Sequence, residues 1–279
     1  MGFFFTFQPM NTPLLKDVKL VVTDMDGTLL NPNHEVSTQF IDQFWALKEK
    51  GITVVAASGR QHNSIVEKLA AVENELTVIA ENGAMTTFHG KETVFTPYPK
   101  GHLNKTLALL KKQENMHPVL CTNGSAFISK GQEKFEPILR EFYSAFNVID
   151  RLEDCTQEVL KIAIYHFESS EKYIFPLVQD LANEVKIKIS GPNWVDLSHP
   201  NANKGFALNA LQKHLGVSQE QTMVFGDYFN DVEMMEQAHF SYAMANAHPE
   251  IIKKANYKTG SNSEFGVETV LEKLLKLVE

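Results

Sequence analysis

The chain has 279 residues, of which 43% are hydrophobic and 22% are charged, and its formal net charge is −8 at pH 7. This composition is typical of a globular protein with one large domain or two ordinary ones, and the acidic balance argues against a general nucleic-acid binder, which needs a basic surface. The two cysteines, without CxxC spacing, exclude a disulfide framework and favour an intracellular, cytoplasmic protein, and no apolar stretch approaches the length that spans a bilayer.

Three short runs of β-branched and apolar residues, separated by helical patterns, organise the first 85 residues. We interpret the runs 19–23, 52–57 and 76–80 as buried strands. Between the first two runs, Ser37 is placed to cap a helix that Gly51 closes. Because strands alternate with helices through short loops, we expect an α/β fold with a parallel, doubly wound sheet.

The pattern changes after residue 85 and returns after residue 193. The intervening stretch contains hairpin-like segments at 89–91 and 123–124. It also contains helix-like segments at 103–112, 135–146 and 173–182, and strand-like segments at 160–167 and 186–190. Strand patterns at 222–225 and 240–244 then resume the α/β alternation. We therefore expect an N-terminal extension of residues 1–15, an α/β core of residues 16–85 and 194–279, and an inserted α+β domain of residues 86–193.

Polar side chains follow four of the predicted core strands. They are Asp24 with Asp26, then Ser58, Asn82 and Asp227. In an open parallel sheet, ligands bind beyond the carboxyl ends of the strands, so these positions are expected to meet at one edge of the sheet. Their convergence indicates a ligand site more strongly than any one of these residues does.

Asp24 and Asp26 lie two residues apart after the first strand, so both side chains face the same way if the backbone stays extended. Two clustered carboxylates repel unless a cation or a proton intervenes, and hard oxygen ligands suit Mg²⁺. The alternative is a strand-end turn with solvated carboxylates. Asp227 is placed to complete a metal site, whereas Asp231 is either a helix-start carboxylate or an outer support for the metal.

Two further segments suit a phosphate group. Ser58 and Gly59 lie between a strand and a helix, where a hydroxyl and free backbone N–H groups can hold an anion, although Ser58 can equally be an ordinary N-cap. Lys204 opens the helix after the inserted domain, where the helix dipole disfavours a cation. That placement indicates a bound anion, and the alternative is a solvated surface lysine.

Taken together, these motifs resemble those of the haloacid dehalogenase superfamily of phosphatases, and more closely its Cof-type sugar-phosphatase branch, whose members carry a large α/β cap. The resemblance covers nearly the whole chain after the first 15 residues. The matching segments, in order, are Asp24-Met25-Asp26-Gly27-Thr28, Ser58-Gly59-Arg60, Glu81-Asn82-Gly83-Ala84, Lys204-Gly205 and Gly226-Asp227-Tyr228-Phe229-Asn230-Asp231. The resemblance implies a Rossmann-like core, with the inserted domain as the cap.

The resemblance also implies roles for these residues. Asp24 would be the nucleophile and a Mg²⁺ ligand, and Asp26 would be the general acid and base, binding the metal through its backbone carbonyl. Asp227 would be the third protein ligand of Mg²⁺, with Asp231 supporting the metal from nearby. The residues that would hold the phosphate oxygens are Met25, through its backbone N–H, and Ser58, Gly59, Lys204 and Asn230.

The function that the resemblance implies is a Mg²⁺-dependent phosphatase that hydrolyses a small phosphorylated metabolite through an aspartyl-phosphate. A sugar phosphate or a phosphorylated cofactor is the expected substrate, and neither nucleic acid nor membrane is an expected partner. Two alternatives are a mutase or phosphotransferase of the same superfamily and a non-catalytic phosphate-sensing protein. A nucleotide-dependent kinase is weaker still, because the sequence has no GxxxxGK[ST] loop.

Overall fold

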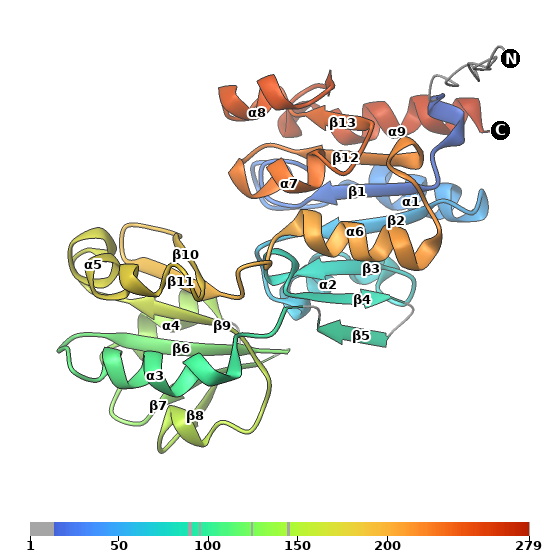
Figure 1. Cartoon of the computed structure of the whole chain (residues 1–279). Helices are drawn as coiled ribbons and strands as arrows, with labels where there is room; N and C mark the ends of the chain where they lie inside the picture. The colour runs from blue at the N-terminus through green and yellow to red at the C-terminus, as the bar shows by residue number, and fades with distance from the viewer. Residues whose placement is uncertain (1–13, 89–90, 95, 124, 144–145, 279) are drawn as a thin grey trace, which may run out of the picture.

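Two β-sheets, each covered by helices, divide the chain into two lobes (Figure 1). The computed structural model describes residues 14–88, 91–94, 96–123, 125–143 and 146–278. The expected N-terminal extension lies almost wholly outside these residues. Within the described ranges, every helix is too short or too polar to cross a membrane.

The larger sheet has the strand order β14-β13-β12-β1-β2-β3-β4-β5. Its strands are β1 (Leu20–Asp24), β2 (Thr53–Ala57), β3 (Thr77–Ala80), β4 (Met85–Phe88), β5 (Lys91–Val94), β12 (Thr222–Gly226), β13 (Phe240–Ala243) and β14 (Tyr257–Lys258). The strands from β14 to β3 are parallel, and β4 and β5 add an antiparallel hairpin at one edge. All five residues of β1 are buried, as expected for the central strand of a doubly wound sheet.

Helices cover both faces of this sheet, which confirms the predicted doubly wound core. They are α1 (Thr38–Glu49), α2 (His62–Lys68), α6 (Lys204–Leu215), α7 (Val232–Met235), α8 (Pro249–Lys254) and α9 (Gly266–Leu277). In Figure 1, α6 lies in front of the sheet and α1 lies behind it. α1 packs against α9, and α6 packs against α7.

The smaller sheet has the order β10-β11-β9-β6-β7-β8 and is antiparallel except for the pair β7 and β8. Its strands are β6 (His117–Thr122), β7 (Ser125–Ser129), β8 (Asn147–Ile149), β9 (Val159–Tyr165), β10 (Lys186–Ile189) and β11 (Trp194–Ser198). Its helices are α3 (Lys100–Leu110), α4 (Glu136–Phe142) and the short α5 (Phe175–Val178). Ile162 and Ala163 of β9 belong to separate apolar clusters, because successive side chains of a strand point to opposite faces. We call this sheet with its helices the cap, and the remainder the core.

The strands of the two sheets place both domain boundaries at other residues than we expected. The strands β4 and β5, most of whose residues we placed in the inserted domain, belong to the core sheet. β11, which we placed in the core, pairs with β9 and β10 in the cap sheet. A hairpin has the same local pattern whichever sheet it extends, so the local pattern alone does not assign these strands.

Two segments of the cap also differ from the predicted elements. The expected helix at 173–182 is a π turn (Ser170–Ile174), then α5, then a 3₁₀ turn (Gln179–Leu181). Pro176 has no backbone N–H to donate, so one regular α-helix cannot continue from the π turn into α5. The two expected hairpins are present as the pairs β4–β5 and β6–β7, although residues 89, 90 and 124 lie outside the described ranges.

Candidate active site

The loops that follow β1, β2, β3 and β12 meet at one edge of the core sheet and enclose a pocket. Its cavity volume is about 390 Å³. The structure brings all five predicted strand-end residues to its walls, namely Asp24, Asp26, Ser58, Asn82 and Asp227, and adds Asn230. Parallel pairing of β1 with both β2 and β12 accounts for this convergence, since it aligns the carboxyl ends of the three strands.

Lys204 lies beneath the pocket and is fully buried. Its Nζ donates to Asp24 Oδ1 at 2.5 Å and to Asp231 Oδ1 at 2.7 Å. The alternative of a solvated surface lysine is therefore wrong. The side chain of Asn203 caps α6 by accepting from the Phe206 N–H, so Lys204 occupies the first turn, where the dipole disfavours it. The two carboxylates offset that disadvantage.

Three carboxylates crowd the floor of the pocket. Oxygens of Asp24, Asp227 and Asp231 all lie within 4.8 Å of one another. Burial raises the pKa of Asp24 from 3.8 to about 8, against the attraction of Lys204, and the charges of Asp231 and Asp227 raise it further. Burial and Asp231 likewise raise the pKa of Asp227 to about 6. Such a set of oxygen donors suits a divalent cation, which would relieve the repulsion among the carboxylates.

The carboxylate of Asp26 is not one of the three and points to a different partner. It accepts from Arg60 at both ends, Nη2 to Oδ1 at 2.6 Å and Nε to Oδ2 at 2.7 Å. His34 Nδ1 lies 3.3 Å from Oδ1. Burial raises the pKa of Asp26, but the bonds and charge of Arg60 outweigh it and lower that pKa below 3.8. Asp26 is therefore an ionised carboxylate in this arrangement, and the sequence motif containing Arg60 did not lead us to this pairing.

Asp231 fixes the turn that carries Asp227. Its Oδ2 accepts from the backbone N–H groups of Asp227 at 2.9 Å and Tyr228 at 3.1 Å, while Oδ1 accepts from Lys204. A Cβ at Gly226 would lie 2.6 Å from the Asp231 side chain, so this contact requires glycine. We left two interpretations of Asp231 open, a helix-start carboxylate and an outer support for the metal. In the structure Asp231 accepts from backbone N–H groups at a helix start, and it also lies beside the proposed metal ligands Asp24 and Asp227.

Gly27 and Thr28 shape the other side of Asp227. Thr28 Oγ1 donates to Asp227 Oδ1 at 3.1 Å. Gly27 has a φ of +79°, and a Cβ there would lie 2.3 Å from Asp227 Oδ2. Any larger residue at position 27 would therefore collide with the carboxylate as well as strain the backbone.

Of the predicted phosphate-binding residues, Ser58, Gly59 and Asn230 line the pocket. Ser58 is buried and its Oγ accepts from the Arg60 N–H at 3.1 Å. The next helix, α2, is capped at Gln61, so Ser58 is not its N-cap. Asn230 donates to Asn82 Oδ1 at 3.1 Å, which links two of the loops. Met25 is fully buried, so its side chain does not reach the pocket.

Comparison with known proteins gives one consistent result. A family model of haloacid dehalogenase-like hydrolases matches residues 21–271, which include every site residue named above. The 5-amino-6-(5-phospho-D-ribitylamino)uracil phosphatase of Escherichia coli is 28% identical over 262 residues, covering 93% of this chain and 97% of the relative. The HMP-PP phosphatase of Cronobacter sakazakii is 26% identical over 243 residues, covering 84% of this chain and 86% of the relative.

Solved structures agree with the fold of both lobes. A crystal structure from Streptococcus mutans superposes with a TM-score of 0.80 at 26% identity, covering 93% of this chain and 99% of the other. A second from Thermotoga maritima superposes with a TM-score of 0.83 at 25% identity, covering 92% of this chain and 97% of the other. The pairing of a parallel core sheet with an inserted cap is thus shared along nearly the full length of these chains.

Proposed function

The chain belongs to the haloacid dehalogenase-like hydrolases, and we propose that it is a Mg²⁺-dependent phosphatase that hydrolyses a small phosphorylated metabolite through a phospho-aspartate at Asp24. One observation carries this proposal. Asp24 lies at the end of the central strand, held by buried Lys204, with the carboxylates of Asp227 and Asp231 beside it. A nucleophile, a fixed cation and a cluster of oxygen donors are the parts that phosphoryl transfer requires.

The oxygen donors fit Mg²⁺. The carboxylates of Asp24 and Asp227 and the backbone carbonyl of Asp26 would hold the ion, while Asp231 is already engaged by Lys204 and two N–H groups. When bound, Mg²⁺ supplies positive charge that reduces the repulsion between Asp24 and an incoming phosphate.

The reaction would proceed in two displacements. An Asp24 oxygen attacks phosphorus, the bond from phosphorus to the leaving oxygen breaks, and Asp26 gives that oxygen a proton. Asp26 then takes a proton from a water molecule, which attacks the phospho-aspartate and frees both inorganic phosphate and the Asp24 carboxylate. Lys204, Ser58 and backbone N–H groups at the pocket rim would stabilise the phosphoryl oxygens in both steps.

Asp26 needs a proton before it can act as the acid, and Arg60 now holds it in the ionised form. Arg60 also lines the pocket, and a phosphate dianion is a strong competitor for a guanidinium. We therefore propose that substrate draws Arg60 away from Asp26, which raises the pKa of Asp26 and lets it take up the proton that it later donates.

The substrate class is proposed from the relatives. The Escherichia coli relative is named for a phosphorylated ribitylaminouracil, and the Cronobacter sakazakii relative for HMP-PP. Both names describe small phosphorylated metabolites. We propose the same class for this chain, with a sugar phosphate or a phosphorylated cofactor precursor as the physiological substrate.

Hydrolysis of p-nitrophenyl phosphate, followed by release of inorganic phosphate, tests the proposal. Activity should vanish with excess EDTA and return with Mg²⁺, and Asp24→Asn should be inactive under both conditions. Full activity in metal-free buffer would contradict the metal dependence. A screen of phosphorylated metabolites should then include sugar acceptors, because transfer of phosphate to a sugar instead of water would identify a phosphotransferase.

A further inference from the structure

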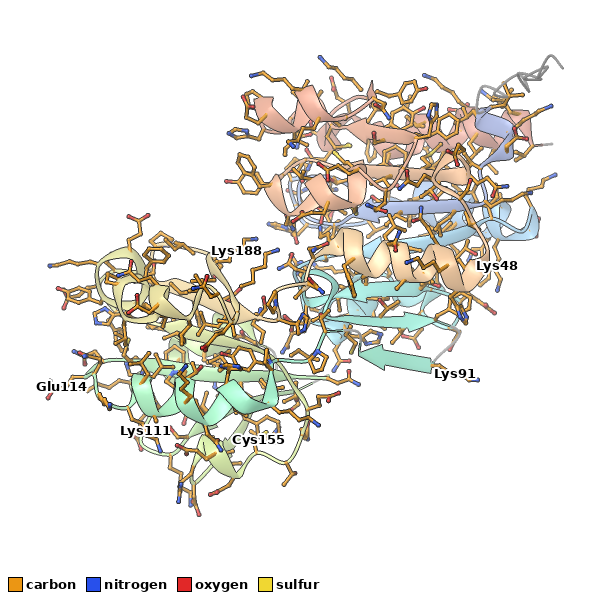
Figure 2. All side chains as sticks on the ribbon, viewed as in Figure 1. Lys48, Lys91, Lys111, Glu114, Cys155 and Lys188 are labelled. Atoms are coloured by element: carbon orange, nitrogen blue, oxygen red, sulfur yellow. The ribbon has the colours of Figure 1, made fainter. Side chains whose placement is uncertain are left out.

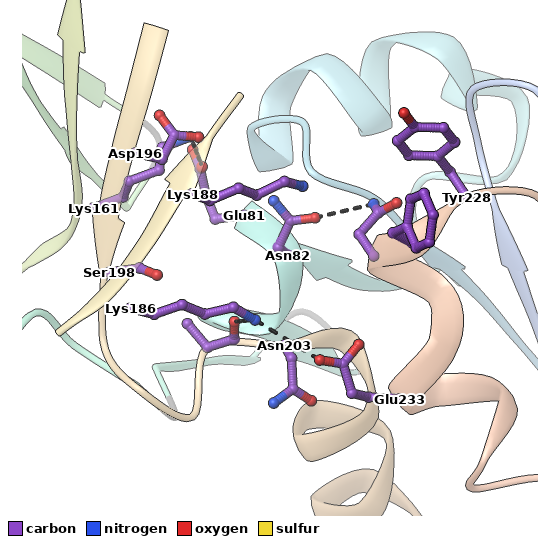
Figure 3. A pocket seen from close by; sticks show the side chains of 13 residues that line it. Glu81, Asn82, Lys161, Lys186, Lys188, Asp196, Ser198, Asn203, Tyr228 and Glu233 are labelled. Atoms are coloured by element: carbon purple, nitrogen blue, oxygen red, sulfur yellow. Dashed lines mark hydrogen bonds and ion pairs between the residues drawn. The ribbon is translucent and has the colours of Figure 1, made fainter. Parts of the chain in front are cut away.

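A second cavity, of about 210 Å³, adjoins the catalytic pocket between the cap and the core. The two cavities share Asn82, Lys188, Tyr228 and Asn230 as lining residues. Of these four, Lys188 alone comes from the cap, on strand β10. Figure 2 shows Lys188 on the side of the cap that faces the core, and Figure 3 shows its side chain running toward Asn82. Lys188 is thus a cap residue that reaches the catalytic pocket.

The ammonium of Lys188 lacks the partner that the sheet would ordinarily give it. Asp196 of β11 stands directly opposite Lys188 in the antiparallel register. However, the Asp196 carboxylate lies 3.6 Å from Lys161 Nζ, and Lys161 also pairs with Glu81 at 2.9 Å. Among the residues that the structure describes, Lys188 forms no ion pair. Its charge is therefore available to a ligand.

Lys186 provides a direct comparison, because it lies two residues away on the same face of β10. Its Nζ donates to the Ala202 carbonyl at 3.2 Å and lies 3.8 Å from Glu233. Lys186 lines the second cavity but not the catalytic pocket. Two lysines of one strand face thus differ in surroundings: Lys186 has partners in the protein, whereas Lys188 has no ion-pair partner in the part of the chain that the structure describes.

The charges around Lys188 favour an anion at its tip. Burial lowers the pKa of Lys188, and the cations Lys204, Lys186 and Lys161 add to that effect against the opposing influence of Asp196. Partial burial is the main cost to the ammonium of Lys188, and an anion at its tip would offset that cost. In the pocket itself, Lys204 is already matched by two carboxylates, so an incoming phosphate dianion leaves negative charge that another cation can offset.

We propose that Lys188 is a cap-borne phosphate-binding residue, whose ammonium contacts the oxygens of the phosphoryl group held over Asp24. This inference rests on the proposed function and deepens it, because the cap would then supply part of the phosphate site itself. The affinity for inorganic phosphate, the common product of every substrate, should depend on Lys188.

Titration calorimetry with inorganic phosphate, at saturating Mg²⁺, tests the proposal without turnover. Lys188→Gln should weaken phosphate binding about 10- to 100-fold, as expected for loss of a charged hydrogen bond. Lys188→Arg should retain most of the affinity. Lys186→Gln is the matched control, since it removes the same charge from the same strand face, and it should bind phosphate as the wild type does.

Steady-state kinetics on esters with different leaving groups complete the test. Lys188→Gln should lower kcat/KM by a similar factor for every leaving group. Unchanged phosphate binding, or a loss confined to particular leaving groups, would overturn the proposal, as would an equal loss in Lys186→Gln. If the wild type binds phosphate through Lys188 but hydrolyses no ester, the proposed function fails while the phosphate site stands.

Discussion

Replacing Lys204 with methionine removes one buried charge and keeps nearly the same side-chain volume. In the wild type, the ammonium lies 2.5 Å from Asp24 and 2.7 Å from Asp231, and no part of it reaches solvent. Its loss leaves two buried carboxylates without their cation. Removing one partner of a buried ion pair costs about 3–5 kcal/mol, within a typical total stability of about 5–15 kcal/mol. The variant should therefore fold, but melt about 6–20 °C lower.

Thermal unfolding in EDTA above pH 8, where Asp24 is ionised in the wild type, measures this effect, because bound metal would mask it. The control is Lys213→Met, on an exposed position in the last turn of the same helix, which should change stability by less than about 1 kcal/mol. Adding Asp231→Asn to Lys204→Met removes one of the two uncompensated carboxylates and should recover part of the lost stability. With Mg²⁺ present, Lys204→Met should lose on the order of 10²–10³ in kcat, and the double variant should not regain it.

Two outcomes would refute this reasoning about Lys204. If Lys204→Met melts at the same temperature as Lys213→Met, the ammonium does not stabilise the carboxylate cluster. If Lys204→Met keeps its kcat on the best substrate, the ammonium does not stabilise the transition state and is a structural cation only.

Three further predictions concern the carboxylates. Asp24→Asn should abolish the phosphoenzyme in mass spectra. Asp26→Asn should still accept phosphate from p-nitrophenyl phosphate, but its rate on alkyl phosphates, whose leaving group needs the acid, should fall about 10²–10⁴-fold. Equal slowing on both substrates would exclude Asp26 as the acid. Because the pKa of Asp24 rises from 3.8 to about 8 on folding, the proton bound there stabilises the metal-free protein fully below pH 3.8, and that contribution is lost as the pH rises through about 8. Mg²⁺ competes with this proton, so it should raise the melting temperature more at pH 8 than at pH 6, and equal shifts at the two pH values would contradict the assignment. Gly27→Ala should cost more than about 1 kcal/mol of stability and weaken Mg²⁺ binding in calorimetry, since its φ is +79° and its Cβ would collide with Asp227; wild-type values for both would show that the loop adapts.

The sequence predicts those features that depend on neighbours along the chain. Strands β1, β2, β3 and β12 are largely apolar runs followed by polar residues, so their positions and the convergence of Asp24, Ser58, Asn82 and Asp227 follow from the general rule for parallel sheets. The unfavourable position of Lys204 at a helix start led us to expect a bound anion, whereas the structure places two carboxylates of the protein itself beside the ammonium.

Features that depend on distant pairing could not be predicted in the same way. The β4–β5 hairpin and β11 have ordinary strand patterns, and which sheet they join depends on edges made elsewhere in the chain. The pairing of Arg60 with Asp26 depends on side-chain directions at the tips of two adjacent strands. The sequence does not distinguish Lys188 from other lysines on cap strands. Only the strand register shows that Asp196 lies opposite Lys188 and that its carboxylate pairs with Lys161 instead.

The discontinuity of the core has a consequence for biosynthesis. β1 pairs with β12, so that Leu20 lies opposite Thr222, and the whole cap is translated between them. Translation proceeds at about 5–20 residues per second, so one edge of the fully buried strand β1 stays unpaired for roughly 10–40 s before β12 is synthesised. Its free backbone groups are meanwhile open to pairing with other nascent chains. Messages truncated within the cap should therefore yield insoluble polypeptides, and chaperones that bind nascent chains should improve the yield of the full-length protein.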